Sequence, residues 1–118
     1  MKLVSLAVPF VLFATGAMAQ QVPDDAVRDL WCGIAFGIVS GSAPTDVNED
    51  QKAIIQAYAD GGLLLIDRSK AVHLQNGYTE ESFAARLDSL AADVTTQVNA
   101  TDNSAQYSFE ECSALLSL

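Results

Sequence analysis

Apolar residues between positions 24 and 116 recur at three- and four-residue spacing, which is the periodicity of helices that bury one face. The pattern predicts a first helix from Asp24 to about Ser40, because two aspartates suit the positive end of a helix dipole. One apolar face of this helix carries Val27, Leu30, Trp31, Ile34 and Ile38, and a second carries Cys32, Phe36 and Val39. A helix that is apolar on more than one side should be central and buried.

The third side of this first helix carries Gly33, Gly37 and Gly41 at four-residue spacing. Small residues at this spacing predict that a partner helix packs close to the glycine edge, with a seam between two copies of the chain as the alternative. Each interior glycine lowers helix stability by about 1 kcal/mol relative to alanine. Tertiary packing and a crosslink are therefore expected to hold the helix in place.

A second helical region follows the linker at residues 41–44, and Thr45 or Asp46 is predicted to cap it. Its first part runs to about Asp60, and Gly61-Gly62 interrupts the pattern before it resumes from 63 to 75. Ile54, Ile55 and Tyr58 are predicted to mark the buried side. Helical spacing continues across the glycines through Ile54, Tyr58, Gly62, Leu65, Ser69 and Val72, which favours one long bent helix over two.

Two more helices are predicted after the Asn76-Gly77 turn. Thr79 is expected to cap the first, which carries an amphipathic stripe of Phe83, Leu87, Leu90, Val94 and Val98. A polar loop over 99–106 leads to a capping box from Ser108 to Glu111. The short last helix is predicted to turn Phe109, Cys112, Leu115 and Leu116 inward. The expected fold is an all-α bundle of four to five helices in a single domain, residues 20–118.

Residues 1–19 have the pattern of a secretory signal peptide. Lys2 provides the positive start, an apolar run extends from Leu3 to Phe13, and the run ends at the small-x-small sequence Ala17-Met18-Ala19. We predict cleavage between Ala19 and Gln20. The alternative is a retained anchor, but an apolar run of about eleven residues is too short for a hydrocarbon core of about 30 Å. The bacterial periplasm is the leading location, with secretion beyond it as the alternative.

An exported protein with two cysteines, Cys32 and Cys112, is expected to form a disulfide. The bond would tie the C-terminal helix to the middle of the first helix. Closing a loop of about 80 residues stabilises the fold by about 4.5 kcal/mol in the chain-entropy model. A metal pair or a redox pair is the alternative, but the flanking Asp29 and Glu110-Glu111 are acidic, whereas low-pKa thiols need electropositive neighbours.

Composition narrows the possible partners. The chain of 118 residues has 15 acidic and 6 basic side chains and a formal net charge of −9, which becomes −10 when Lys2 leaves with the signal peptide. Nucleic-acid binding requires clustered Lys and Arg, so it is not expected. Half of the residues are hydrophobic, which is not the composition of a disordered chain. The length allows one domain.

No pattern of catalytic or metal-binding residues is found in the sequence. The single histidine, His73, lies near a helix end, where capping or solvent exposure is the usual role. The acidic stretch 46–50 lacks the glycine and the glutamate of a calcium loop and is predicted to be a solvated helix start. Six charged residues are predicted to lie on helix surfaces: Asp67, Arg68, Lys70, Glu80, Glu81 and Arg86. We therefore expect no enzyme activity, no cofactor and no metal.

The Trp31-Cys32 pair near the predicted mature start, in a small exported helical chain with two cysteines, resembles the HdeA-type periplasmic acid-stress chaperones. Cys112 lies at the very end of this chain without the long basic tail of those proteins, so no residue role is carried over. The expected function is non-enzymatic binding of another envelope protein, or chaperone-like binding as carboxylates lose charge near pH 4. The alternatives are a carrier of an apolar small molecule and a subunit of an envelope complex.

Overall fold

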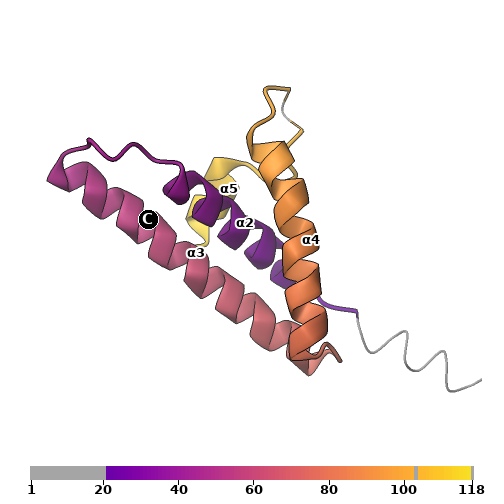
Figure 1. Ribbon diagram of the computed structural model, residues 1–118. Helices are drawn as coiled ribbons and strands as arrows, with labels where there is room; N and C mark the ends of the chain where they lie inside the picture. The colour runs from indigo at the N-terminus through magenta and orange to yellow at the C-terminus, as the bar shows by residue number, and fades with distance from the viewer. Residues whose placement is uncertain (1–20, 103, 118) are drawn as a thin grey trace, which may run out of the picture.

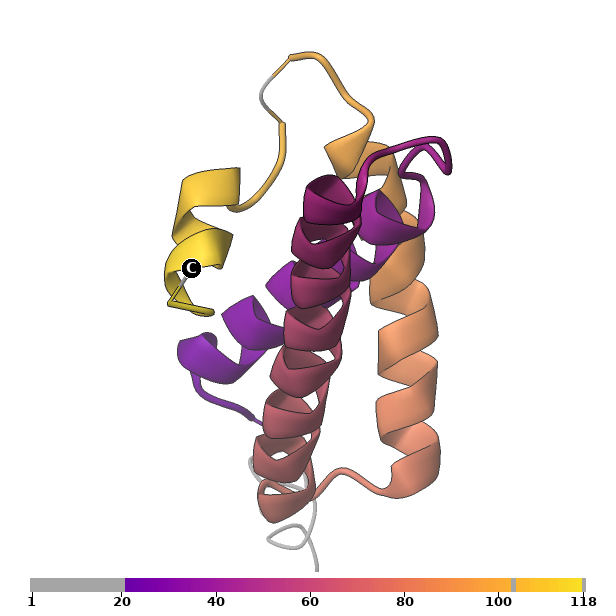
Figure 2. The ribbon, with the colours of Figure 1, turned by 90° about the vertical axis from the view of Figure 1, so that its left-hand side faces the viewer.

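The computed structural model describes residues 21–102 and 104–117, which form four α-helices and, within those ranges, no β-strand. The helices are α2 (Asp24–Gly41), α3 (Glu49–Gln75), α4 (Glu80–Val98) and α5 (Phe109–Ala114). Helices α3 and α4 diverge from the turn that joins them, and α2 lies between them (Figure 1). Helices α4 and α5 lie on opposite sides of the α2–α3 pair (Figure 2). The all-α prediction is confirmed, with four helices.

The predicted signal peptide and its cleavage between Ala19 and Gln20 lie outside the described residues. Within the described part of the chain, no helix is both long and apolar enough to cross a membrane.

Thr79 and Ser108 cap α4 and α5, as the sequence predicted, and at both helices the cap is a capping box. At α4 the Thr79 hydroxyl accepts a hydrogen bond from the Ser82 N–H at 3.0 Å, and the Ser82 hydroxyl accepts one from the Thr79 N–H at 2.9 Å. At α5 the Ser108 hydroxyl accepts from the Glu111 N–H, and the Glu111 carboxylate accepts from the Ser108 N–H. These reciprocal bonds satisfy N–H groups that have no partner within the helix.

The start of α3 differs from the prediction. Neither Thr45 nor Asp46 caps the helix, which begins after Asn48. The Asn48 side chain accepts from the Gln51 N–H at 2.9 Å, and the Gln51 side chain accepts from the Asn48 N–H at 3.1 Å. Asn48 is favoured because Gln51, three residues later, completes the capping box.

Helices α2 and α3 cross with their backbones in contact at Gly33 and Gly62. A Cβ atom added to Gly33 would lie 2.7 Å from the Gly62 carbonyl oxygen, and one added to Gly62 would lie 2.9 Å from the Gly33 carbonyl oxygen. The predicted close packing on the glycine edge is therefore confirmed at Gly33. Gly37 and Gly41 lie beyond the crossing, where an added Cβ meets no described atom within 4 Å.

Gly61-Gly62 does not interrupt the second helical region, because α3 is one helix of 27 residues. Gly62 faces α2, whereas Gly61 faces the segment after α5. A Cβ on Gly61 would lie 2.6 Å from a methyl carbon of Leu116. The two glycines therefore admit close neighbours on two sides of one continuous helix.

Cys32 and Cys112 form the predicted disulfide, which joins the middle of α2 to α5. Both cysteines are buried, and Leu115 and Leu116 pack against the same core. A helix of six residues is too short to be stable alone. The crosslink and this packing therefore hold α5 in place.

The core is centred on α2. The α4 stripe is confirmed, because Phe83 and Val94 are buried and Leu87, Leu90 and Val98 pack against the core. The inward prediction is wrong for Val39, Ile54 and Phe109, which are 55%, 57% and 59% exposed. They belong to the end of α2, the start of α3 and the start of α5, where α3 and α4 have already diverged.

The helix crossing predicts that alanine substitutions at two glycines of α2 change the free energy of unfolding in opposite directions. Gly33→Ala should lower the free energy of unfolding by about 1–3 kcal/mol, because its Cβ meets the rigid backbone of α3. Gly37→Ala, four residues later on an open part of the same helix, should raise it by about 0.5–1 kcal/mol through helix propensity. Urea denaturation followed by circular dichroism measures both. Equal effects would contradict the backbone contact.

Candidate functional site

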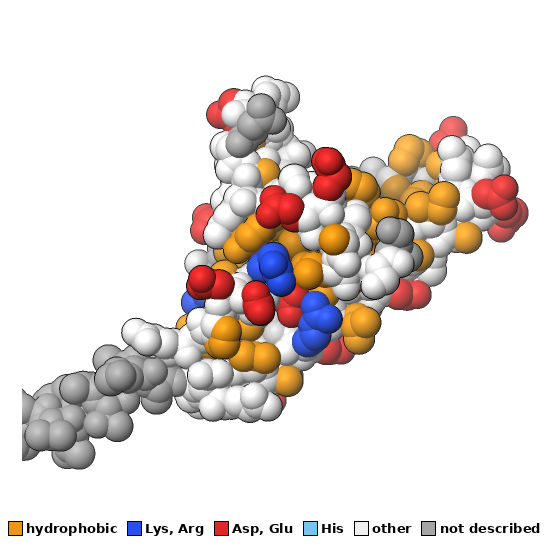
Figure 3. Space-filling view, turned by 180° about the vertical axis from the view of Figure 1, so that it is seen from behind, with side chains coloured by type: hydrophobic (Ala, Val, Ile, Leu, Met, Phe, Trp, Pro, Cys, Tyr) orange, Lys and Arg blue, Asp and Glu red, His pale blue; other side chains and the backbone are white. Residues whose placement is uncertain are grey.

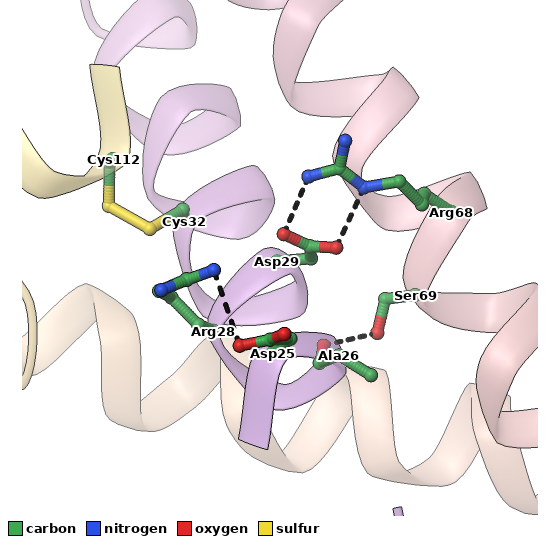
Figure 4. Close-up of polar contacts among 8 residues, drawn as sticks. All are labelled: Asp25, Ala26, Arg28, Asp29, Cys32, Arg68, Ser69 and Cys112. Atoms are coloured by element: carbon green, nitrogen blue, oxygen red, sulfur yellow. Dashed lines mark hydrogen bonds and ion pairs between the residues drawn. A yellow bond between two sulfur atoms is a disulfide. The ribbon is translucent and has the colours of Figure 1, made fainter. Parts of the chain in front are cut away.

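An ion pair between a buried carboxylate and a half-exposed guanidinium lies at the end where α3 and α4 meet. Asp29 of α2 is 6% exposed, and the Arg68 guanidinium of α3 holds it with two hydrogen bonds, from Nε to Oδ2 at 2.8 Å and from Nη2 to Oδ1 at 2.7 Å (Figure 4). A paired arrangement of this kind is the strong form of a charge-assisted hydrogen bond. Arg68 lies on the helix surface as predicted, but its pairing with the buried Asp29 was not foreseen. The only sequence signal was the position of Asp29 directly before the apolar run of α2.

One turn further along α3, Ser69 and His73 form a second buried polar group. The Ser69 hydroxyl donates to the Ala26 carbonyl oxygen of α2 at 2.6 Å. The His73 ring lies between two aromatic rings, with centroid distances of 4.8 Å to Tyr78 and 5.1 Å to Phe83. His73 is 0% exposed, so the expected solvent-facing histidine is wrong. Its ring is enclosed because the turn after α3 folds Tyr78 back over it.

The Ser69–His73 pair is not arranged for nucleophilic catalysis, although Ser69 Oγ lies 3.2 Å from His73 Nδ1. His73 Nδ1 is also 2.8 Å from the Ser69 carbonyl oxygen, which can only accept, so Nδ1 carries the proton. A protonated Nδ1 cannot take a proton from the hydroxyl. Both side chains are also fully buried, which keeps a substrate from reaching them.

The second ring nitrogen, Nε2, is buried and has no hydrogen-bond partner among the described residues. With the proton on Nδ1, charging the ring would place a second N–H where no acceptor receives it. Burial lowers the pKa of His73 below its ordinary value, and the positive charge of Arg86 lowers it further, against an opposing effect of the Ser69 carbonyl. His73 is therefore held neutral inside the fold.

An apolar cleft lies at the other end of the molecule, where α3 and α4 have diverged. It consists of two adjoining hollows of about 320 Å³ and about 600 Å³, which share Val39 of α2 and Val98 of α4. Residues from the loops after α2 and after α4 complete its walls. We call this surface the open-end cleft.

Four aromatic rings line the smaller hollow. Trp31 and Tyr107 pack edge to face with centroids 5.5 Å apart, and Phe36 and Phe109 do so at 6.3 Å. Cys112 also lines this hollow, so the disulfide holds α5 and Phe109 against α2. In the larger hollow, Ile54 from α3 and Val39 are more than half exposed. Exposed apolar side chains that gather around a hollow are typical of a binding surface.

The remaining predicted positions form no metal site among the described residues. The acidic stretch 46–50 is exposed except for Val47, and the described residues contain no group of three or more potential ligands placed to hold a metal ion. Lys70 and Glu80 form an ion pair of 2.6 Å between α3 and α4.

No family model, no curated protein and no solved structure matches this chain.

The ion pair between Asp29 and Arg68 should stabilise the fold. Arg68→Met keeps the aliphatic stem but leaves a buried carboxylate without its partner, so the free energy of unfolding should fall by about 1–3 kcal/mol. The control is Lys52→Met, which breaks an exposed pair with Glu49 and should change it by less than about 0.5 kcal/mol. Urea denaturation compares them, and an equal loss in both variants would contradict the role of Asp29 burial.

His73 should make stability depend on pH. The pKa of His73 in the folded protein lies below its value of about 6.5 in the unfolded chain. At a pH below about 6.5, the unfolded chain therefore binds a proton that the folded protein does not bind. The free energy of unfolding should therefore fall as the pH drops from 7 to 5.5, with a slope of at most about 1.4 kcal/mol per pH unit. His73→Leu should remove most of this slope, as measured by urea denaturation at each pH. An unchanged slope in the His73→Leu variant would show that other titratable groups cause the pH dependence of stability.

Proposed function

We propose that this protein is an exported, non-enzymatic binding protein that holds an apolar segment of another protein in the open-end cleft. The observation that carries this proposal is the cleft itself. Val39, Ile54 and Phe109 line it and are exposed by more than half, although Phe109 also packs against the buried Phe36 ring. Covering such a surface would contribute roughly 25 cal/mol for each Å² of apolar area removed from water.

Export is supported by two independent features of the chain. The signal-peptide pattern of residues 1–19 is one. The other is the Cys32–Cys112 disulfide, because such bonds persist in oxidising compartments outside the cytosol. The periplasm or the extracellular space is therefore the proposed location.

A non-catalytic role is supported by the geometry of His73, the only histidine of the chain. The side chain has its proton committed at Nδ1 and is closed off from solvent. Its contribution is structural, since it links α3 to the turn that leads into α4.

A carrier of an apolar small molecule is the second candidate, and the aromatic hollow favours it. The hollow of about 320 Å³ lies at the lower end of the usual range for ligand pockets, which is roughly 300–1,000 Å³. We prefer a protein segment because the hollow continues into the larger one past Val39 and Val98. The two candidates predict different crosslinked products.

Photo-crosslinking in cells that export the protein tests the proposal. Val39→benzoylphenylalanine, on the cleft, should give a covalent adduct with another polypeptide, whereas Leu63→benzoylphenylalanine should not. Leu63 is 64% exposed and apolar but does not line the cleft, which makes it a matched control. A small-molecule adduct at position 39 would favour the carrier. Equal adducts at both positions, or none at position 39, would overturn the proposal.

A further inference from the structure

The chain segments that line the cleft carry an excess of negative charge. Two stretches provide most of its lining, residues 42–55 and 97–111. They contain six exposed carboxylates, namely Asp46, Glu49, Asp50, Asp102, Glu110 and Glu111. The single cation in these stretches is Lys52, whose ammonium lies 3.3 Å from a Glu49 carboxylate oxygen. Most of the negative charge of these two stretches is therefore not neutralised by a cation within them.

The other cations of the described residues lie away from the cleft and are already engaged. Arg28, Arg68 and Lys70 form ion pairs with Asp25, Asp29 and Glu80, and Arg86 donates to the Tyr78 hydroxyl. In Figure 3 the blue side chains lie near the middle of the molecule among red ones, and further red side chains lie at the free end of α3. None of these engaged cations lines the cleft, so they do not neutralise the carboxylates of the two lining stretches.

The cleft also limits the backbone conformation of a partner segment that could bind in it. The described residues contain no strand edge, so they offer no row of backbone groups on which an extended peptide could pair. An extended segment would turn unpaired N–H and C=O groups toward apolar walls, which is unfavourable. A helix satisfies these groups internally and presents only side chains.

From these observations we infer that the cleft takes a basic amphipathic helix of a partner protein, an assignment that rests on the proposed function. The apolar stripe of that helix lies against Val39, Ile54 and Phe109. Lysines and arginines on its flanks face the carboxylates of the two lining stretches. The net charge of −9 attracts such a segment during diffusional encounter.

Three synthetic peptides of eighteen residues with one common leucine stripe test the inference by fluorescence anisotropy. Their flanks carry lysine, glutamine or glutamate. The lysine peptide should bind to the full mature protein at least about tenfold more tightly than the glutamine peptide, and its advantage should shrink as salt screens the charges. The glutamate peptide should bind most weakly.

Two variants separate cleft binding from general attraction to an acidic protein. Val39→Asp makes the chain more negative, so general attraction would strengthen binding of the lysine peptide, whereas cleft binding should weaken by about tenfold or more. Leu63→Asp adds the same charge away from the cleft and should not weaken it. Circular dichroism checks that both variants are folded.

The outcomes distinguish the two levels of the proposal. If all three peptides bind equally and Val39→Asp weakens the binding of each, the preference for basic flanks is overturned, while the cleft remains a protein-binding surface. If no peptide binds, or if Val39→Asp and Leu63→Asp behave alike, the inference is overturned, and the crosslinking at position 39 decides the proposed function separately.

Discussion

The contact between the backbones of α2 and α3 at Gly33 and Gly62 determines the register of the rest of the fold. The two helices run antiparallel, so residues before Gly33 face residues after Gly62. Asp29 therefore meets Arg68, and the Ala26 carbonyl meets Ser69. On the other side of the crossing, Phe36 meets Tyr58, with ring centroids 5.1 Å apart. One close approach, possible only between glycines, places a polar cluster at one end and apolar rings at the other.

This arrangement separates the contacts that stabilise the fold from the surface for which we propose binding. At the end where α3 and α4 meet, charged and polar side chains are paired across helices, and His73 is enclosed by Tyr78 and Phe83. At the open end the helices are too far apart for their apolar side chains to cover one another. The apolar surface and the negative charge left there are available to a partner.

The disulfide connects these two roles. A helix of six residues has little stability of its own, yet α5 forms a wall of the cleft and carries Phe109 into it. The bond to Cys32 attaches that wall to the most buried part of α2. An oxidising compartment is therefore a condition for the cleft as well as for the stability of the fold.

The sequence alone determined the features that depend on neighbours within a few residues, or on simple counts. The caps at Thr79 and Ser108, the stripe of α4 and the pairing of two cysteines are of this kind. Only the tertiary structure decided that His73 is buried, that Arg68 holds Asp29, and that Val39, Ile54 and Phe109 remain exposed. Periodicity shows which side of a helix is apolar, but burial depends on whether another helix reaches that side. That depends on the angle and position of the glycine crossing, which no local pattern encodes.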